Sequence, residues 1–189
     1  MRVIAGTARR IPLAAPKSDH TRPTTDRIKE TLFNMLRDDI PECMFLDLFA
    51  GSGGIGIEAL SRGANKAVFV ETDKAAYDCI RANLSKTRLN DRAYVMRSDV
   101  AAALGRLEES FGSFDVIFAD PPYRKGWEKR LSDMLAGSRL CDENTLIIVE
   151  SALDTPTDWI DESCYEVERI KDYKTNRHIF LRKKRRTEE

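Results

Sequence analysis

Residues 44–56 read MFLDLFAGSGGIG, a short apolar run that ends in a cluster of glycines. The length of the apolar run predicts a buried strand, and the residues after the glycines, to about Arg62, predict a helix. A strand, a glycine-rich turn and a helix in this order are typical of the first unit of a doubly wound α/β domain. This stretch therefore predicts an α/β fold.

The segments downstream repeat the alternation of strand and helix. Further apolar runs predict strands at 66–70, 93–96, 114–119 and 145–149. Helical spacing between them predicts helices at 74–88, 99–110 and 126–137. Two last strands, about 164–170 and 177–182, have no helix between them, which predicts an antiparallel C-terminal hairpin at the sheet edge. We therefore predict a doubly wound, mostly parallel seven-stranded sheet that is Rossmann-like and covered on both faces.

The residues before this sheet form an N-terminal extension. Residues 2–6 and 9–13 predict a short β-hairpin around a turn at Gly6. Residues 24–38 predict a helix, because Ile28 and Leu32 begin a helical apolar pattern that Thr24 or Thr25 can cap. The chain has 189 residues and no repeat or linker. We expect one domain, 1–189, in which residues 1–23 are the extension and contact RNA if the substrate is RNA.

Composition is that of an ordinary globular protein, with 42% apolar and 33% charged residues. The longest apolar runs fall far short of the roughly 20 residues that span a bilayer. The first residues lack the apolar segment of a signal peptide. The four cysteines are widely spaced, and with only two histidines besides they form no metal-binding pattern. We expect a cytoplasmic protein with reduced cysteines and without a metal.

The formal net charge is zero, but basic residues gather near the two ends of the chain. The N-terminal ones include Arg9, Arg10, Arg22 and Arg27, and residues 182–186 are all basic. Such ends can meet phosphates or can be solvated tails. The charge pattern permits a nucleic-acid partner without requiring one.

The glycine cluster has the spacing of a loop that binds a nucleoside-containing cofactor. Residues 51–56 match G-x-G-x-x-G, and Glu71 lies 20 residues after Gly51, at the end of the next predicted strand. Glycines let the backbone approach a ligand, and a carboxylate one strand over accepts hydrogen bonds from ribose hydroxyls. Both NAD and S-adenosylmethionine (SAM) fit this arrangement.

Two aspartates favour SAM. Asp47 lies inside an apolar strand, where a carboxylate is costly to bury without a partner, and the α-ammonium of a methionine moiety would be such a partner. Asp99 follows the third predicted strand, where it can accept a hydrogen bond from an adenine amino group. Asp99 can equally cap the next helix, and the two roles are compatible.

The tetrapeptide Asp120-Pro121-Pro122-Tyr123 ends the fourth predicted strand, at the edge where open α/β sheets bind ligands. The two prolines stiffen the chain and remove backbone donors, which leaves a cluster of acceptors around the Asp120 carboxylate. Such a cluster suits an exocyclic base amino group, whose alignment lowers the barrier to methyl transfer. Tyr123 offers a face for base stacking, worth about 1–3 kcal/mol. Asp120 is also a candidate acceptor of the proton that the methylated amine releases.

These residues and two further segments together resemble a known family. The further segments are RPTTDRIKETLFNML at 22–36 and GIEALSRGA at 56–64. With DLFAGSGG at 47–54, Glu71, Asp99 and the D-P-P-Y motif, they are similar to the RsmD family of bacterial 16S rRNA (guanine-N2)-methyltransferases, which are class I SAM-dependent enzymes. The resemblance covers nearly the whole chain.

The resemblance implies methyl transfer from SAM to the exocyclic N2 amino group of a guanine in 16S rRNA, within a small-subunit assembly particle, leaving S-adenosylhomocysteine. We expect a monomer. The residues implied in catalysis are Asp120, Pro121, Pro122 and Tyr123. Those implied in cofactor binding are Thr24, Asp47, Phe49, Gly51, Ser52, Gly53, Glu71, Asp73 and Asp99. Those implied in RNA contact are Arg9, Arg10, Arg22 and Arg27.

Three other functions stay open on the sequence. The D-P-P-Y motif is shared with adenine methyltransferases, so an adenine-N6 methyltransferase acting on RNA or DNA is the first alternative. An NAD-dependent dehydrogenase would use the glycine loop and Glu71 but would leave D-P-P-Y without a role. A non-catalytic RNA-binding module with the same fold is the third.

Overall fold

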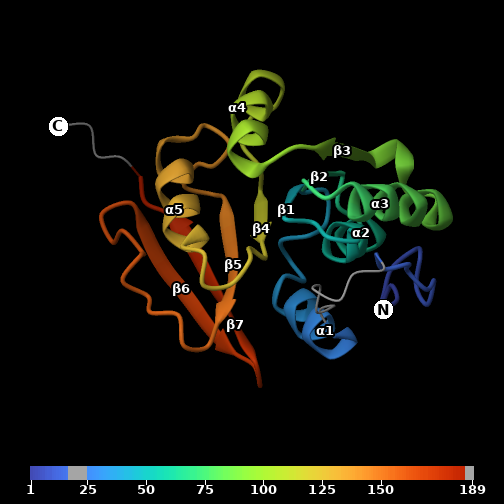
Figure 1. Cartoon of the computed structure of the whole chain (residues 1–189), viewed down its shortest axis with the longest axis horizontal. Coiled ribbons are helices and arrows are strands. Elements are labelled where there is room, and N and C mark those ends of the chain that lie inside the picture. The colour runs from blue at the N-terminus through green and yellow to red at the C-terminus, as the bar shows by residue number, and fades with distance from the viewer. Residues whose placement is uncertain (17–24, 186–189) are drawn as a thin grey trace.

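The computed structural model describes residues 1–16 and 25–185, in which seven strands form one sheet in the order β3-β2-β1-β4-β5-β7-β6 (Figure 1). The strands are β1 (Met44–Leu48), β2 (Lys66–Glu71), β3 (Ala93–Arg97), β4 (Val116–Ala119), β5 (Leu146–Ala152), β6 (Tyr165–Asp172) and β7 (Asn176–Lys183). The helices are α1 (Asp26–Met35), α2 (Gly54–Ser61), α3 (Lys74–Thr87), α4 (Val100–Ser110) and α5 (Trp127–Gly137), with a 3-10 turn at Asn90–Arg92. The predicted doubly wound sheet is confirmed.

The strand order places a switch point between β1 and β4. Strands β3, β2, β1, β4 and β5 are parallel, whereas β7 pairs antiparallel with both β5 and β6. Ligands of open α/β sheets bind outside the carboxyl ends of the strands at such a point. Leu48 on β1 is paired with Ala119 on β4. The residues that follow these two strands therefore leave the sheet side by side.

Two apolar layers cover the sheet, because strands of a parallel sheet are buried on both faces. Phe45 on β1 packs in the layer that holds α1, α2 and α3. The next residue, Leu46, points to the opposite layer, which holds α4 and α5. The helices thus cover β1 and β4 on both faces. The polar residues of this region lie at the carboxyl ends of the two strands.

The N-terminal extension forms the predicted hairpin only in a short form. Residues 1–3 and 10–13 are joined by backbone hydrogen bonds, among them Val3 to the carbonyl of Ile11 at 3.0 Å, around one antiparallel bridge between Arg2 and Pro12. Beyond this bridge, backbone donors of the extension go to side chains of α2. Glu58 accepts the N–H groups of Ile4 and Ala5 at 2.8 and 2.9 Å. The extension is therefore a short hairpin whose turn lies along α2.

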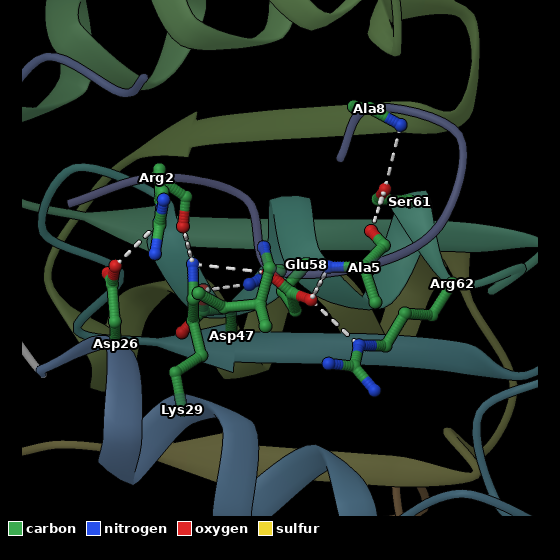
Figure 2. A network of polar contacts seen from close by, with 11 residues as sticks. Arg2, Ala5, Ala8, Asp26, Lys29, Asp47, Glu58, Ser61 and Arg62 are labelled. Carbon is green, nitrogen blue, oxygen red and sulfur yellow. Dashed lines mark hydrogen bonds and ion pairs between the residues drawn. The ribbon is translucent and has the colours of Figure 1, made fainter. Parts of the chain in front are cut away.

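A buried ion pair joins this hairpin to α1 and α2 (Figure 2). The side chain of Lys29 on α1 is fully buried, and its Nζ lies 3.2 Å from Oε2 of Glu58. The same Nζ donates to the carbonyl of Arg2 at 2.6 Å. Arg62, four residues after Glu58, donates from Nε to Oε1 at 2.7 Å. Burial lowers the pKa of Lys29, and the charge of Glu58 opposes that effect.

Two element boundaries depart from the sequence-based ranges in ways that bear on the site. Helix α1 begins at Asp26, with Thr25 as its cap, because Oγ1 of Thr25 accepts the N–H of Ile28 at 3.3 Å. Strand β5 continues to Ala152, three residues beyond its predicted end, because Ala152 still pairs with Asn176 on β7. This extension keeps Glu150 within the sheet.

Candidate active site

The glycine loop connects β1 to α2 at the switch point. Gly53 has φ +79° and stands at the N-cap of α2, a backbone conformation that side-chain-bearing residues rarely adopt. A Cβ at Gly56 would lie 2.4 Å from the ring of Phe69, so glycine at this position lets α2 pack directly on β2. The loop therefore has both the open backbone and the close helix–strand contact that the motif predicts.

Glu71 at the end of β2 is held against this loop. Its Oε2 accepts the N–H of Gly51 at 2.7 Å, and its Oε1 accepts the N–H of Asp73 at 2.8 Å. Asp73 in turn caps α3, since its carboxylate accepts the N–H of Ala76. The half-buried carboxylate of Glu71 is fixed by the backbone beside the loop, at the position where a ribose acceptor is predicted.

Asp47 lies behind the loop and is 2% exposed. Its Oδ2 accepts the N–H of Gly56 at 2.8 Å. Burial raises the pKa of Asp47 to about 7, and the charge of Glu71 adds to this, while the bond from Gly56 opposes it. A nearby cation would stabilise the ionised form of such a buried carboxyl group. This fits the predicted role of Asp47 towards a ligand ammonium.

Ser52 and Phe49 shape the two sides of the loop. The carbonyl of Ser52 accepts a bond from Nδ2 of Asn83 on α3, at 3.0 Å. Phe49 has φ +60°, and its ring packs edge-on against Trp127 of α5, with centroids 5.0 Å apart. A bulky residue in this conformation is strained, and such strain is typical of ligand sites. The loop is thereby fixed to α3 on one side and to α5 on the other.

Asp99 follows β3 and caps α4 by accepting the N–H of Ala102 at 3.0 Å. The cap role considered from the sequence is therefore confirmed. Its role towards an adenine remains a prediction.

The D-P-P-Y residues follow β4, next to the residues that follow β1. The N–H of Asp120 lies 3.4 Å from the carbonyl of Leu48. Burial raises the pKa of Asp120 well above its usual range, and the charges of Glu150 and Asp47 raise it further. Pro121 is buried and Pro122 is exposed. The motif thus presents a carboxyl group that holds a proton more readily than an ordinary aspartate.

Tyr123 points its hydroxyl into the protein and leaves part of its ring open. The side chain is 38% exposed, and its hydroxyl donates to Oε1 of Glu150 at 2.6 Å. Glu150 also accepts bonds from Asn176 and His178 on β7. Sequence analysis missed this acceptor, although one signal was present: Glu150, like Asp47, interrupts the apolar pattern of a buried strand.

Three of the four basic residues predicted to contact RNA lie in the described part of the chain, and all three are exposed. Residues 1–7 run along α2, so that Arg9 and Arg10 follow the contact of Thr7 with Ser61 at the far end of that helix. Eight helical residues put this end about 12 Å from the glycine loop. Arg27 is exposed on α1. Arg22 and Thr24 lie outside the described residues.

Asn83 connects the extension to the glycine loop. Its Oδ1 accepts the N–H of Ala14 at 2.8 Å, and its Nδ2 donates to the carbonyls of Ala14 and Ser52. Asn83 is 1% exposed, and the sequence pattern of α3 had not singled it out. One buried amide thus joins the N-terminal residues to the loop predicted to hold the cofactor.

Among the residues that the structure describes, no three side chains of His, Cys, Asp or Glu gather as a metal site requires. None of the helices between residues 25 and 185 is long and apolar enough to cross a bilayer.

Comparison with known proteins identifies the family. The family model described as conserved hypothetical protein 95 matches residues 1–182. Over 164 residues the chain is 36% identical to "Ribosomal RNA small subunit methyltransferase D" of Escherichia coli K12, which covers 84% of this chain and 81% of that protein. The chain belongs to the RsmD family of methyltransferases. The Haemophilus influenzae protein of the same name is also 36% identical, over 163 residues and 84% of each chain.

Solved structures agree with membership in the RsmD family. The Escherichia coli protein yhhF, described as a candidate methyltransferase, has a TM-score of 0.82 and 31% identity, over 98% of this chain and 99% of that one. A hypothetical protein of Thermus thermophilus has a TM-score of 0.81 and 30% identity, over 95% and 98% of the two chains. SMU.776, solved with S-adenosylhomocysteine, has a TM-score of 0.64 over 79% and 49%, and at 14% identity it shows the fold alone.

Proposed function

We propose that the protein transfers a methyl group from SAM to the exocyclic N2 amino group of a guanine in 16S rRNA. One observation carries the proposal: the glycine loop and D-P-P-Y leave neighbouring strands at the same sheet edge, with Asp47 and Asp120 close enough for the charge of one to raise the pKa of the other. A cofactor site and an acceptor cluster therefore face one reaction space. The names of the RsmD relatives from Escherichia coli and Haemophilus influenzae support small-subunit rRNA as the substrate.

The residues at the loop fit SAM. Asp47 is a buried carboxylate that a ligand ammonium would stabilise, and Glu71 is a fixed acceptor for ribose hydroxyls. Gly51, Ser52 and Gly53 would line the cofactor, with Phe49, Asp73, Asp99 and Thr24 beside it. SAM, when bound, supplies a methyl group on a positively charged sulfur.

The D-P-P-Y residues would orient the guanine. Asp120 and nearby carbonyls accept the N–H bonds of the N2 amino group, which aligns its lone pair for transfer. Tyr123 stacks on the base, which must first leave its own stack at a cost of a few kcal/mol. Asp120 then takes the proton that the methylated nitrogen loses, a role for which a raised pKa is suited. Arg9, Arg10, Arg22 and Arg27 would contact RNA phosphates.

The test uses labelled SAM and small-subunit particles that lack rRNA methylation, with naked 16S rRNA in parallel. We expect label in N2-methylguanosine, and a loss of about 100-fold or more for Asp120→Ala. The matched control is Asp133→Ala, an exposed aspartate on α5, which should keep wild-type rates. We expect the protein to act as a cytoplasmic monomer on the assembling particle, so naked rRNA should be the poorer substrate.

The other outcomes separate the alternatives. Label in N6-methyladenosine would replace guanine by adenine as the target. A wild-type rate of methyl transfer by Asp120→Ala would show that the D-P-P-Y carboxylate has no role in the reaction. Stabilisation of the protein by NAD but not by S-adenosylhomocysteine, measured as a shift in melting temperature, would indicate a dehydrogenase instead.

A further inference from the structure

Glu150, near the end of β5, is the common acceptor of three side chains, one from the D-P-P-Y motif and two from β7. It is 5% exposed, and its Oε1 accepts the Tyr123 hydroxyl at 2.6 Å and Nδ2 of Asn176 at 2.7 Å. Its Oε2 lies 2.9 Å from Nε2 of His178. Three converging donors fix the carboxylate in one position and favour its ionised form.

His178 is itself held in place. Its side chain is fully buried, and its Nδ1 lies 3.2 Å from the hydroxyl of Tyr173. A ring hydrogen on Nε2 donates to Glu150, and the Tyr173 hydroxyl can satisfy Nδ1 either as donor or as acceptor. Burial acts to raise the pKa of Glu150, but the bond and charge of His178 and the bonds from Tyr123 and Asn176 outweigh it, and the net pKa is lowered.

Asp120 lies beside this anion. Ala119 is paired with Val149, so Asp120 and Glu150 are the next residues of two neighbouring strands. The charge of Glu150 adds to burial in raising the pKa of Asp120. The pKa values of the two carboxyl groups are thus shifted in opposite directions. Glu150 favours the ionised form and Asp120 favours the protonated form. Such a division marks the acid–base roles within a site.

We propose that Glu150 is a positioning residue for the methyl transfer: it anchors the ring of Tyr123 at the base and sets a fixed negative charge behind Asp120, so that Asp120 retains the proton released by the target nitrogen. This inference rests on the proposed function. In the reaction the N–C bond forms as the S–C bond breaks, with the bonding pair left on sulfur. The nitrogen loses one proton to the Asp120 carboxylate, which passes it to water after the product leaves.

The proposal predicts a change in pH dependence. Two charged groups face Asp120: Glu150 on β5 and Asp47 on β1. The titratable groups that contact Glu150 are Tyr123 and His178, and Tyr173 contacts the other side of the histidine ring. Transfer needs ionised Asp120, so its rate should rise with pH through the pKa of that group. Removing the charge of Glu150 should move the midpoint of this rise to lower pH.

The experiment measures single-turnover methyl transfer to small-subunit particles against pH, together with KM for the particle. For Glu150→Gln we expect the midpoint to fall by about one pH unit. Tyr123→Phe keeps the charge and loses the anchor, so its midpoint should stay while KM rises up to about tenfold. Glu162→Gln is the matched control. Glu162 is exposed before β6, at the opposite end of the sheet, and its variant should behave as wild type.

An unchanged midpoint in Glu150→Gln, or an unchanged KM in Tyr123→Phe, overturns the proposal. Folding of each variant is checked by the shift in melting temperature that S-adenosylhomocysteine produces. If Glu150→Gln does not fold, Glu150→Asp replaces it, since this variant keeps the charge and should keep the wild-type midpoint with a raised KM. Absence of transfer by the wild-type protein would instead refute the proposed function, so the two failures are distinct.

Discussion

Two buried glutamates, Glu58 on α2 and Glu150 on β5, are held by different kinds of partners. Glu58 forms ion pairs with two basic side chains: Lys29 lies 3.2 Å away and Arg62 lies 2.7 Å away. Two backbone N–H groups of the extension complete its shell (Figure 2). Its negative charge is therefore compensated within the network.

Glu150 has partners of another kind. In the described part of the chain, neither a lysine nor an arginine forms an ion pair with it, and its donors are a phenol, an amide and an imidazole. These donors fix its position, and the charge of Glu150 raises the pKa of Asp120 beside it. The comparison teaches that a carboxylate paired with lysine and arginine holds chain segments together, whereas one that lies beside a second carboxyl group also changes the chemistry of that neighbour.

The largest effect is expected from Glu58→Gln. The variant leaves Lys29 as a buried cation without its anion, which typically costs about 3–5 kcal/mol of unfolding free energy. Urea denaturation measures the change. Adding Lys29→Met to the variant should restore part of the loss, because it removes the stranded charge. A cost below about 1 kcal/mol for Glu58→Gln would contradict the idea that this network anchors the extension.

Asp47→Asn extends the comparison to a carboxylate whose bonded partner is a backbone N–H. The pKa of Asp47 is raised in the folded protein to about 7, above its unfolded value. Its contribution to stability is thus fully present below about pH 4 and is lost as pH rises to about 7. The Asn variant has no carboxyl group to ionise and so avoids this loss. Its free energy of unfolding should therefore exceed that of the wild type by about 2–4 kcal/mol at pH 8 and equal it near pH 4.

Denaturation without ligand at the two pH values measures this difference. Cofactor affinity supplies the control, because loss of the charge should weaken SAM binding even where the variant is the more stable protein. An Asn variant less stable than wild type at pH 8 would mean that the Asp47 charge is already compensated in the ligand-free protein.

Glu150→Gln should cost less stability than Glu58→Gln. The variant leaves no buried lysine without a partner. It weakens three hydrogen bonds that the ionised carboxylate accepts, which should lower the free energy of unfolding by about 1–3 kcal/mol in total. Its main effect should fall on methyl transfer. Parallel urea titrations of the two glutamine variants test the order. An equal or larger cost for Glu150→Gln would make its network an anchor of the same kind as that around Glu58.

The smallest effect is expected from Tyr173→Phe. This variant removes only the hydroxyl that contacts Nδ1 of His178, at a cost of about 1 kcal/mol. His178 keeps its bond to Glu150, so the pH midpoint of methyl transfer should stay within error of the wild type. A midpoint shift as large as that of Glu150→Gln would place Tyr173 among the groups that set the charge of the site.

Much of the fold follows from local sequence patterns. Apolar runs, glycines and caps predict the strands and helices, and the carboxyl ends of parallel strands necessarily share an edge. Asp47, Glu71 and Asp120 could therefore be predicted to lie near one another before any contact was known. The hairpin predicted over residues 2–13 is shorter in the structure, because the pattern does not show that Glu58 of α2 takes the backbone donors of Ile4 and Ala5.

The contacts around the two glutamates could not be predicted in the same way. Lys29 lies on an amphipathic helix, and charged residues of such helices usually face water. Its burial depends on Glu58, which is 29 residues further along the chain. His178 meets Glu150 across 28 residues, and only because β7 lies between β5 and β6. Such pairings depend on strand order and packing, which a periodic pattern does not determine.

The position of β7 also affects the order in which the site can be completed during synthesis. The glycine loop and D-P-P-Y lie before residue 124, whereas Asn176 and His178 come after the whole of β5 and β6 in the sequence. Because a chain is made from its N-terminus, the residues that would bind cofactor and base emerge before those that hold Glu150. A chain interrupted before β7 would carry the whole recognisable motif set and still lack the partners that orient Tyr123.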